Sequence, residues 1–382
     1  MFIFSFSQNP HKVRNFIYEM QYNFVILHLV KSAGNMNDIN RSNIEAFLKL
    51  IEKAERPVIV THAKPDGDAM GSTVAMYHFL GLLGKESRKV VLNDRCPGYL
   101  RYLEATVPAQ DLVIHNDTPS DAEDAIAQAD LVLCLDFHAF HRTRNLETAL
   151  ASSKAAKILV DHHLDPDRSL YEVSFSETAI SSASELLYWI LMATPQIDSK
   201  AENLPAECAT ALMTGMTTDT NNFNNSVYPT TLIMASQMLA AGVDRDFILQ
   251  KINQEHSENR LRLKGFMLKD LLKVTDDGVA FMILDKVAQL RYNMQEGDTE
   301  GFVNEPLSIA DVRMSIYARE DKGEIRISIR SKKGTSANRC ARLFFDGGGH
   351  ENAAGGKLLI PIGEVEEYIR KYTHIYMTEY EK

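Results

Sequence analysis

The chain is 382 residues long, with 41 Lys and Arg against 51 Asp and Glu and a formal net charge of −10. Its apolar fraction of 45% and charged fraction of 24% are ordinary for a globular protein, and the length suggests two domains. The acidic balance argues against a protein that coats duplex DNA through bulk positive charge. No stretch approaches the roughly 18 consecutive apolar residues of a membrane span. The four cysteines are far apart and form no C-x-x-C pair, so we expect a cytoplasmic protein without a zinc ribbon or a disulfide framework.

Residues 1–35 stand apart from the rest of the chain. They hold five of its 17 phenylalanines and lack the positively charged opening of a secretory signal. We expect a poorly ordered extension, or a segment that precedes the working start at Met36. Ordered structure is expected just beyond Met36, because residues 42–45 have capping-box spacing ahead of an apolar helix face.

From residue 57 to residue 161, short apolar runs alternate with helical stretches. This alternation predicts an α/β domain with a doubly wound, mostly parallel sheet. A helix is expected at 69–83, and helices dominate from 182 to about 273. The predicted strands are 58–60, 90–92, 112–114, 131–135 and 158–160.

A turn is predicted at 275–278, where the helix-rich pattern ends. We expect a smaller α+β domain beyond it. Its predicted strands are 279–284, 312–317, 324–329 and 357–360, and its predicted helices are 337–345 and 364–372. The resulting domain prediction is an extension at 1–35, a catalytic domain at 36–240, a helical linker at 241–275 and a substrate-binding domain at 276–382.

Acidic residues and histidines follow three of the predicted strands. Any one Asp after a strand is most often a turn former or helix cap. Together, however, the three strand ends bring four Asp and three His to one edge of the sheet, where open α/β sheets bind ligands. Burying so many carboxylates without cations is prohibitive. A metal site is therefore predicted from His62, Asp66, Asp68, Asp136, Asp161, His162 and His163, with Asp219 at a predicted helix end.

The spacing favours two metal ions over one. In His62-x-x-x-Asp66-x-Asp68 the two carboxylates can face different ions while Asp136 bridges them. Imidazole combined with hard carboxylates, and no thiolate, suits Mn²⁺ better than structural zinc, with Mg²⁺ or Co²⁺ as substitutes. Four coordinating Asp side chains would balance two divalent cations and leave a neutral site that accepts a phosphate.

These motifs, in this order, resemble those of the DHH phosphoesterase family. The stretch from Phe345 to Gly355 resembles the glycine-rich signature of the DHHA1 domain that follows it in that family. The likeness is greatest to the group that hydrolyses very short RNA and dephosphorylates 3′-phosphoadenosine 5′-phosphate. The resemblance covers about residues 40–375, and it implies an active site in the cleft between the two domains.

The resemblance also implies a role for each site residue. His62 and Asp66 would hold one ion, while Asp68, His162 and Asp219 would hold the other, with Asp136 bridging. Asp161 would orient a histidine, and His163 would stabilise charge on the phosphate or protonate the leaving oxygen. In the second domain, Arg330, the glycine loop Gly347, Gly348 and Gly349, and His350 would hold the terminal nucleotide.

The predicted function is therefore a two-metal phosphoesterase that converts very short oligonucleotides to mononucleotides and the adenosine bisphosphate to AMP and phosphate. One alternative is a phosphodiesterase for cyclic or linear dinucleotides. The non-enzyme alternative is a nucleotide-sensing module with a decayed metal site. No duplex DNA and no membrane is expected as a partner. A homodimer fits the resemblance, although no sequence feature fixes it.

Overall fold

The computed structural model describes residues 39–254, 256–295 and 297–381. The expectation for residues 1–35 lies outside them. The described chain forms two compact units, one ending at Ile252 and the other running from Asn253 and including Pro97–Tyr99. This division falls inside the segment 241–275, so the domain boundaries given above stay a prediction. Among the described residues, no helix is long and apolar enough to cross a membrane.

The first unit contains a six-stranded parallel sheet in the order β3-β2-β1-β4-β5-β6. The chain order reverses between β1 and β4, which is the switch point at which such sheets bind ligands. All five predicted strands are present, and a sixth that we did not predict, β6, pairs with β5. The strands are β1 Pro57–Thr61, β2 Lys89–Leu92, β3 Leu112–Ile114, β4 Leu131–Leu135, β5 Ala156–Asp161 and β6 Val173–Ser176.

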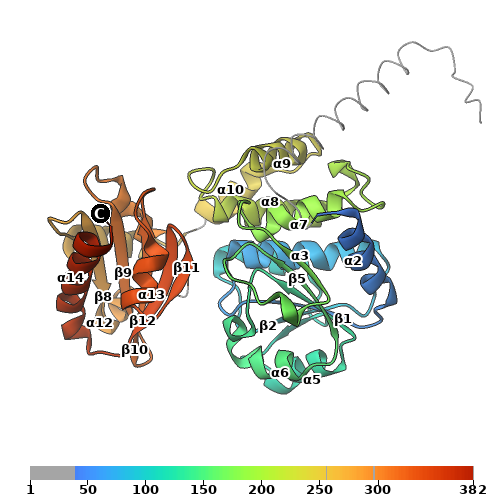
Figure 1. Cartoon of the computed structure of the whole chain (residues 1–382), viewed down its shortest axis with the longest axis horizontal. Coiled ribbons are helices and arrows are strands. Elements are labelled where there is room, and N and C mark those ends of the chain that lie inside the picture. Colours follow the sequence, from blue (N-terminus) through green and yellow to red (C-terminus); the bar gives the residue numbers. More distant parts are fainter. Residues whose placement is uncertain (1–38, 255, 296, 382) are drawn as a thin grey trace, which may run out of the picture. The chain divides into compact units, whose positions relative to one another are not determined.

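Helices cover both faces of this sheet, with α5 and α6 on one side and α3 on the other (Figure 1). The strands are buried on both faces, which explains their continuous apolar character. The helices are α2 Arg41–Lys53, α3 Gly67–Leu82, α4 Arg101–Glu104, α5 Pro119–Gln128, α6 Glu147–Ser152, α7 Ala183–Met192, α8 Ala206–Asp219, α9 Pro229–Ala240 and α10 Arg245–Asn253.

Helices α3 and α8 approach each other closely because both carry glycine at the contact. A Cβ added at Gly71 would lie 2.6 Å from the carbonyl oxygen of Ala211 and 2.8 Å from the Cα of Gly215. No real Cβ atom is tolerated at such distances, so only glycine fits at position 71. This contact brings the start of α3 close to the end of α8.

The second unit is built on a mixed sheet in the order β11-β12-β10-β9-β8-β7. Its strand pairs are antiparallel except for β8 with β9. The strands are β7 Lys273–Val274, β8 Val279–Leu284, β9 Met314–Asp321, β10 Glu324–Ser331, β11 Gly348–His350 and β12 Ala353–Leu358, and the helices are α11 Glu258–Phe266, α12 Lys286–Arg291, α13 Ala337–Phe344 and α14 Val365–Ile375.

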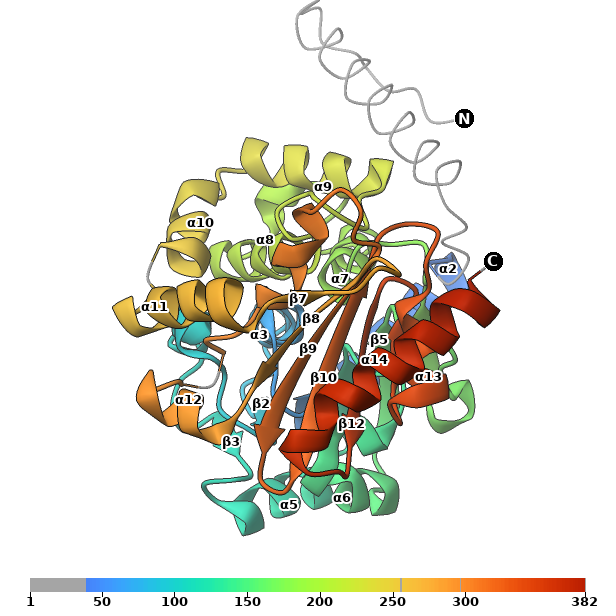
Figure 2. The same ribbon diagram turned by 90° about the vertical axis from the view of Figure 1, so that its left-hand side faces the viewer.

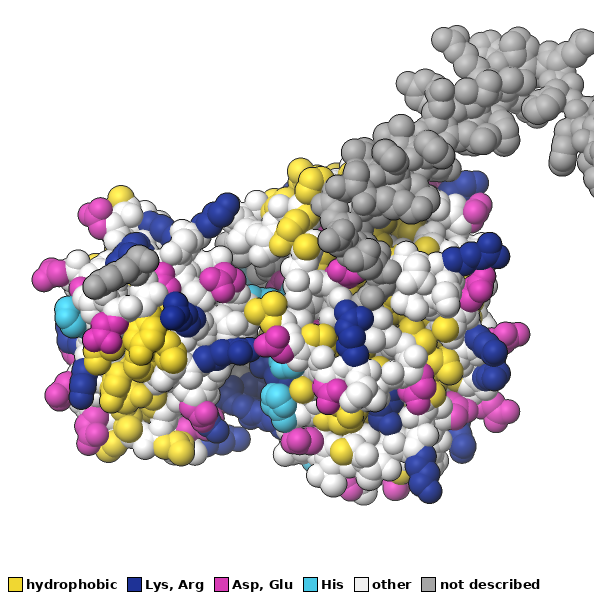
Figure 3. All heavy atoms as spheres, in the orientation of Figure 1, with side chains coloured by type: hydrophobic (Ala, Val, Ile, Leu, Met, Phe, Trp, Pro, Cys, Tyr) yellow, Lys and Arg dark blue, Asp and Glu magenta, His cyan; other side chains and the backbone are white. Residues whose placement is uncertain are grey.

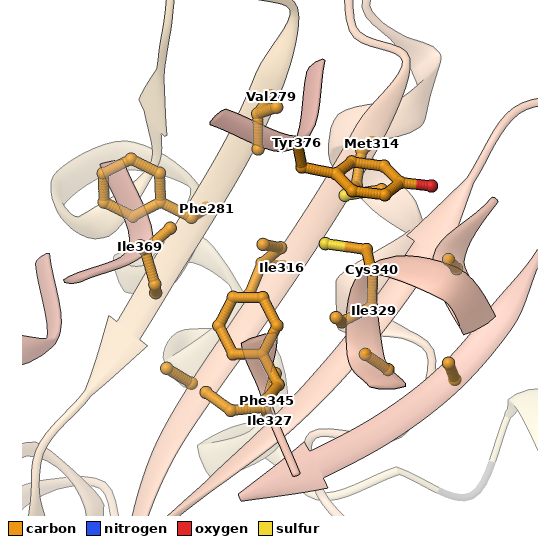
Figure 4. Packing of buried hydrophobic residues seen from close by; sticks show 14 of the residues in the cluster. Val279, Phe281, Met314, Ile316, Ile327, Ile329, Cys340, Phe345, Ile369 and Tyr376 are labelled. Carbon is orange, nitrogen blue, oxygen red and sulfur yellow. The ribbon is translucent and has the colours of Figure 1, made fainter. Parts of the chain in front are cut away.

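Helices α13 and α14 lie over one face of this sheet (Figure 2). Alternate residues of β10 point into the core beneath them, where Ile327 and Ile329 pack with Phe345 and Cys340 (Figure 4). The side chains of the residues between them, such as Arg326 and Arg330, project from the opposite face of the sheet.

Two predictions for this unit are wrong. The strand predicted at 357–360 is β12, at Ala353–Leu358. The predicted glycine loop is largely a strand, because Gly348–His350 form β11 at the edge of the sheet. Both errors have one cause: Ala and Gly are poor strand formers, and here the strands are made by backbone pairing of β12 with β10 and of β11 with β12.

Lys and Arg are interspersed with Asp and Glu on the visible face of each unit (Figure 3).

Candidate metal centre

Three adjacent strands, β1, β4 and β5, end beside one another and deliver the predicted site residues. His62 follows β1 directly, Asp136 follows β4, and Asp161 is the last residue of β5. Asp136 has a left-handed backbone, with φ of 61°, a conformation that Asp tolerates better than most residues. Parallel pairing therefore places these side chains at one edge, as the sequence predicts.

Helices α3 and α8 supply the remaining carboxylates. Asp66 is the N-cap of α3, where its Oδ1 accepts hydrogen bonds from the backbone N–H groups of Asp68 and Ala69, both at 3.1 Å. Asp219 is the last residue of α8. Because α3 and α8 pack through their glycines, Asp68 and Asp219 both reach the same histidine, His162.

The side chains form two groups that share Asp136. On one side, His62 Nε2 lies 3.4 Å from Asp136 Oδ2 and 3.8 Å from Asp66 Oδ1. On the other side, His162 Nε2 lies 3.5 Å from Asp136 Oδ1, 3.7 Å from Asp68 Oδ2 and 3.6 Å from Asp219 Oδ2. The ligand atoms of His62, Asp66 and Asp136 lie within 4.8 Å of one another, as do those of Asp68, Asp136 and His162.

The centre is buried and one of its oxygens is unsatisfied. Asp68 and Asp136 are each 2% exposed, and His162 is 5% exposed. Asp136 Oδ1 is buried and has no hydrogen-bond partner among the described residues. A buried carboxylate oxygen without a donor is strongly destabilised unless a cation or proton meets it. This oxygen, and the nitrogen and oxygen donors around it, fit a divalent metal ion.

The pKa values show how crowded the carboxylates are. Burial, together with the charges of Asp136 and Asp219, raises the pKa of Asp68 well above its ordinary value. Burial likewise raises the pKa of Asp219 to about 6, with Asp66 and Asp136 adding to the effect. Although burial opposes its ionisation, His162 and His62 hold the pKa of Asp136 well below its usual range. Bound cations would relieve this repulsion between like charges.

Asp68 is also tied to the scaffold. Its Oδ2 accepts a hydrogen bond from the backbone N–H of Ala183 at 2.7 Å, and its Oδ1 accepts one from Ser184 at 2.9 Å. These are the first two residues of α7, where backbone donors lack partners within the helix. The positive end of the α7 dipole thus fixes the carboxylate. Nothing in the sequence marked this contact, because α7 lies far from Asp68 along the chain.

Asp161 orients His163. Its Oδ1 lies 2.8 Å from His163 Nδ1, and its Oδ2 accepts a hydrogen bond from the His163 backbone N–H at 3.1 Å. Asp161 is fully buried. His163 Nδ1 also lies 3.7 Å from Asp136 Oδ1, so His163 adjoins the carboxylate that both groups share.

A further histidine lies beside His163. The ring centroids of His138 and His163 are 5.7 Å apart, and ligand atoms of His138, Asp161 and His163 lie within 4.8 Å of one another. The rings of His138 and His141 meet edge to face at 5.9 Å, so His138 adjoins the centre and His141 adjoins His138.

The predicted substrate-binding residues belong to the second unit. Arg330 of β10 and His350 of β11 both pair with Ala353 of β12, so all three stand in one row across the sheet. Side chains of directly opposed residues in antiparallel strands leave the same face. The structure therefore places Arg330 and His350 on one face, at the edge formed by the glycine strand.

Comparison with known proteins agrees with this arrangement. The description "DHH family, N-terminal domain" matches residues 56–216, and "DHHA1 domain" matches residues 279–371. A solved structure titled as an exopolyphosphatase-related protein from Bacteroides fragilis is 35% identical, with a TM-score of 0.80 over 88% of this chain and 97% of that one. The chain belongs to the DHH family and carries the DHHA1 domain after the DHH domain.

More distant relatives carry more specific names. "Bifunctional oligoribonuclease and PAP phosphatase NrnA" of Thermus thermophilus is 29% identical, over 81% of this chain and 86% of that protein. "Cyclic-di-AMP phosphodiesterase GdpP" of Geobacillus thermodenitrificans is 26% identical, over 87% of this chain but 49% of that protein. RecJ from Thermus thermophilus, solved in complex with Mn²⁺, shares the fold at 15% identity, with a TM-score of 0.52 over 88% of this chain and 55% of that one.

Proposed function

We propose that this chain is a metal-dependent phosphoesterase that hydrolyses very short oligonucleotides to mononucleotides. We infer further that it converts 3′-phosphoadenosine 5′-phosphate to AMP and phosphate. The observation that carries the proposal is the sharing of the buried Asp136 by two groups of ligand atoms. The name of the Thermus relative, which covers most of both chains, supports this pair of substrates.

The cofactor in this proposal is a pair of Mn²⁺ ions, for which Mg²⁺ or Co²⁺ can substitute. His62 and Asp66 would hold one ion, Asp68, His162 and Asp219 would hold the other, and Asp136 would contribute one carboxylate oxygen to each. Two such ions supply an activated water and neutralise charge on the phosphoryl oxygens. The Mn²⁺ complex of RecJ, which shares the fold, supports the choice of ion.

The chain's own groups complete the reaction. A water oxygen forms a bond to phosphorus while the bond from phosphorus to the ester oxygen breaks, and that oxygen must gain a proton. His163 is proposed to donate this proton from Nε2, since its Nδ1 faces the buried carboxylate of Asp161. A positioned general acid of this kind contributes about 10²–10⁴-fold to the rate.

The second unit is proposed to hold the terminal nucleotide. Arg330 and His350 stand in one row of the sheet, and a guanidinium grips a phosphate through two parallel hydrogen bonds. A site that recognises the end of a chain favours substrates a few nucleotides long. Short oligonucleotides and the adenosine bisphosphate are therefore the expected partners.

The name of the Geobacillus relative favours a second candidate, hydrolysis of cyclic dinucleotides. The same metal centre could perform it, because the bond broken is again a phosphoric ester. The two candidates differ in whether the substrate must offer a free end.

Rates on a panel of substrates test the proposal and separate it from its alternatives. The protein with Mn²⁺ would be incubated with labelled RNA of two to twenty nucleotides, cyclic dinucleotides and the adenosine bisphosphate. We expect the fastest initial rates on the shortest RNAs and measurable phosphate release from the bisphosphate. Faster cleavage of the cyclic compounds would favour the second candidate. Nucleotide binding without any hydrolysis would establish the sensing module instead.

A further inference from the structure

The three consecutive glycines before His350 do not serve the same purpose. A Cβ at Gly347 would overlap the carbonyl oxygen of Gly355. Gly349 has φ of +149°, and a Cβ there would lie 2.6 Å from the carbonyl oxygen of Ala353. The backbone therefore requires glycine at both positions.

Gly348 differs from both neighbours. Its φ lies outside the left-handed region, and the nearest atom to an added Cβ would be 3.6 Å away, an ordinary van der Waals contact. The fold would therefore accept alanine at position 348. Neither the backbone conformation nor a steric clash requires glycine here. The absence of a side chain at Gly348 therefore leaves space beside the residues that face it.

Two polar side chains of α13 face that room. The nearest atoms to the Cβ position of Gly348 are Asn338 Oδ1 at 3.6 Å and Arg342 Nε at 3.8 Å. The two residues are one turn apart on α13, which packs beside β11 (Figure 1). An acceptor and a donor thus both lie close to the position where Gly348 lacks a side chain.

Asn338 is placed for a partner that the described residues do not supply. The residue is 7% exposed, and its Oδ1 is buried without a hydrogen bond to any described residue. Leaving a buried acceptor unsatisfied costs about 1–3 kcal/mol. Such a group in a folded protein calls for a ligand or an ordered water.

We propose that Asn338 and Arg342, facing Gly348, read the base of the substrate's terminal nucleotide and select a base that carries an amino group. The inference rests on the proposed function and specifies which part of the substrate the second unit reads. Asn338 Oδ1 accepts a hydrogen bond from the amino group, and Arg342 donates to the neighbouring ring nitrogen. Adenine and cytosine present this pair of groups side by side.

The acceptor character of Asn338 Oδ1 excludes a phosphate at this point, because ionised phosphate oxygens are also acceptors. Hypoxanthine and uracil carry a carbonyl oxygen where adenine and cytosine carry the amino group. The carbonyl oxygen of hypoxanthine or uracil would then face Asn338 Oδ1. Both atoms are hydrogen-bond acceptors, so no hydrogen bond could form between them.

The test compares diadenylate with di-inosinate, which differ in that amino group. We expect the wild-type protein to prefer diadenylate. Asn338→Leu keeps the side-chain volume but removes the acceptor, so it should raise KM for diadenylate by about tenfold and abolish the preference. The ratio of its kcat/KM on diadenylate to its kcat/KM on the base-free diester bis(4-nitrophenyl) phosphate should fall by the same factor.

Gly348→Ala provides a second variant that should fold normally. Its methyl group would occupy the space in front of Asn338 and should raise KM for diadenylate without lowering the melting temperature. Gly363→Ala is the matched control, because a Cβ there meets no atom within 4 Å and KM should not change.

Each failure has its own meaning. An unchanged preference for diadenylate in Asn338→Leu would overturn the inference. An equal rise in KM for both dinucleotides would indicate a ribose contact and would also overturn it. If the wild-type protein hydrolyses no nucleotide, the proposed function fails instead. In that case the affinities for AMP and IMP would be measured by calorimetric titration. The inference requires that Asn338→Leu weakens the binding of AMP and leaves the binding of IMP unchanged.

Discussion

The two units differ in the exposure of the charged side chains at their candidate sites. In the first unit, charged side chains such as Asp68 and Asp136 are almost fully buried at the ends of parallel strands. In the second, Arg330 and His350 are partly exposed on a strand row, and Arg342 is exposed. Buried like charges are stable only with counter-ions, whereas partly exposed cations and backbone groups need none. The first unit is therefore built to hold metal, and the second is suited to meeting an organic ligand.

The largest effect should come from the carboxylate that both groups share. Asp136→Ala removes a ligand atom from each proposed ion, and we expect kcat on diadenylate to fall by at least about 10³-fold, since metal-ion catalysis supplies several kcal/mol. Rates with excess Mn²⁺ would be compared with those of Asp117→Ala. Asp117 is a suitable control because its side chain is 41% exposed and forms a surface ion pair with Arg95. Retained hydrolysis in Asp136→Ala would refute the shared-carboxylate centre.

The next largest effect should follow from releasing His163. Asp161→Asn keeps the shape of the side chain but removes the negative charge that lies beside His163 Nδ1. We expect kcat to fall by about 10²-fold while the affinity for Mn²⁺ stays within a few-fold of wild type. Asp167→Asn, which changes an exposed helix-capping carboxylate, serves as the control. A large loss of Mn²⁺ affinity would mean that Asp161 is itself a metal ligand.

The affinity for Mn²⁺ should depend on pH. Although burial favours the neutral ring, Asp136 and Asp66 raise the pKa of His62 to about 10 in the metal-free protein. Carboxylates likewise raise the pKa of His162 well above its ordinary value. Both rings are then protonated at neutral pH and must lose a proton to bind a cation. Affinity should therefore rise between pH 6 and pH 8, by about tenfold per pH unit for each proton released.

Calorimetric titrations of Mn²⁺ in buffers with different heats of ionisation would count the released protons. The Asp219 carboxyl, with its pKa raised to about 6, strengthens the dependence at the acidic end. An affinity that does not change with pH would contradict this electrostatic account.

The smallest effect is expected in the second unit. Arg330→Ala should raise KM for diadenylate by about tenfold, the value of a charge-assisted hydrogen bond, and should leave kcat within about twofold. The rate on bis(4-nitrophenyl) phosphate should not change, because that diester has no nucleotide to hold. Lys333→Ala, a change on an exposed side chain just beyond β10, is the comparison. Equal effects on both substrates would exclude the proposed role.

Much of the first unit was predictable because its signals are local. The strands up to β5 are continuous apolar runs, and the acids and histidines follow them directly. Strand β6 was missed because Val173–Ser176 alternates apolar and polar residues over only four positions. In the second unit, β11 and β12 consist largely of glycine and alanine, so the sequence carries no strand pattern there.

Within the candidate site, the sequence indicated the residue types but not their hydrogen bonds. The support of Asp68 by α7 and the pairing of Asp161 with His163 depend on how elements meet in space. The sequence also could not show that Gly348 has space for a Cβ while Gly347 and Gly349 do not, because this depends on which atoms surround each glycine in the fold.

The hydrogen bonds between Asp68 and the start of α7 join residues 115 and 116 positions apart in the chain. Contacts of such separation form late, because a long loop must close first. During synthesis, the segment from β1 to β5 leaves the ribosome before the helices that complete the centre. A nascent chain cut before α8 would lack Asp219, one of the carboxylates that lie around His162.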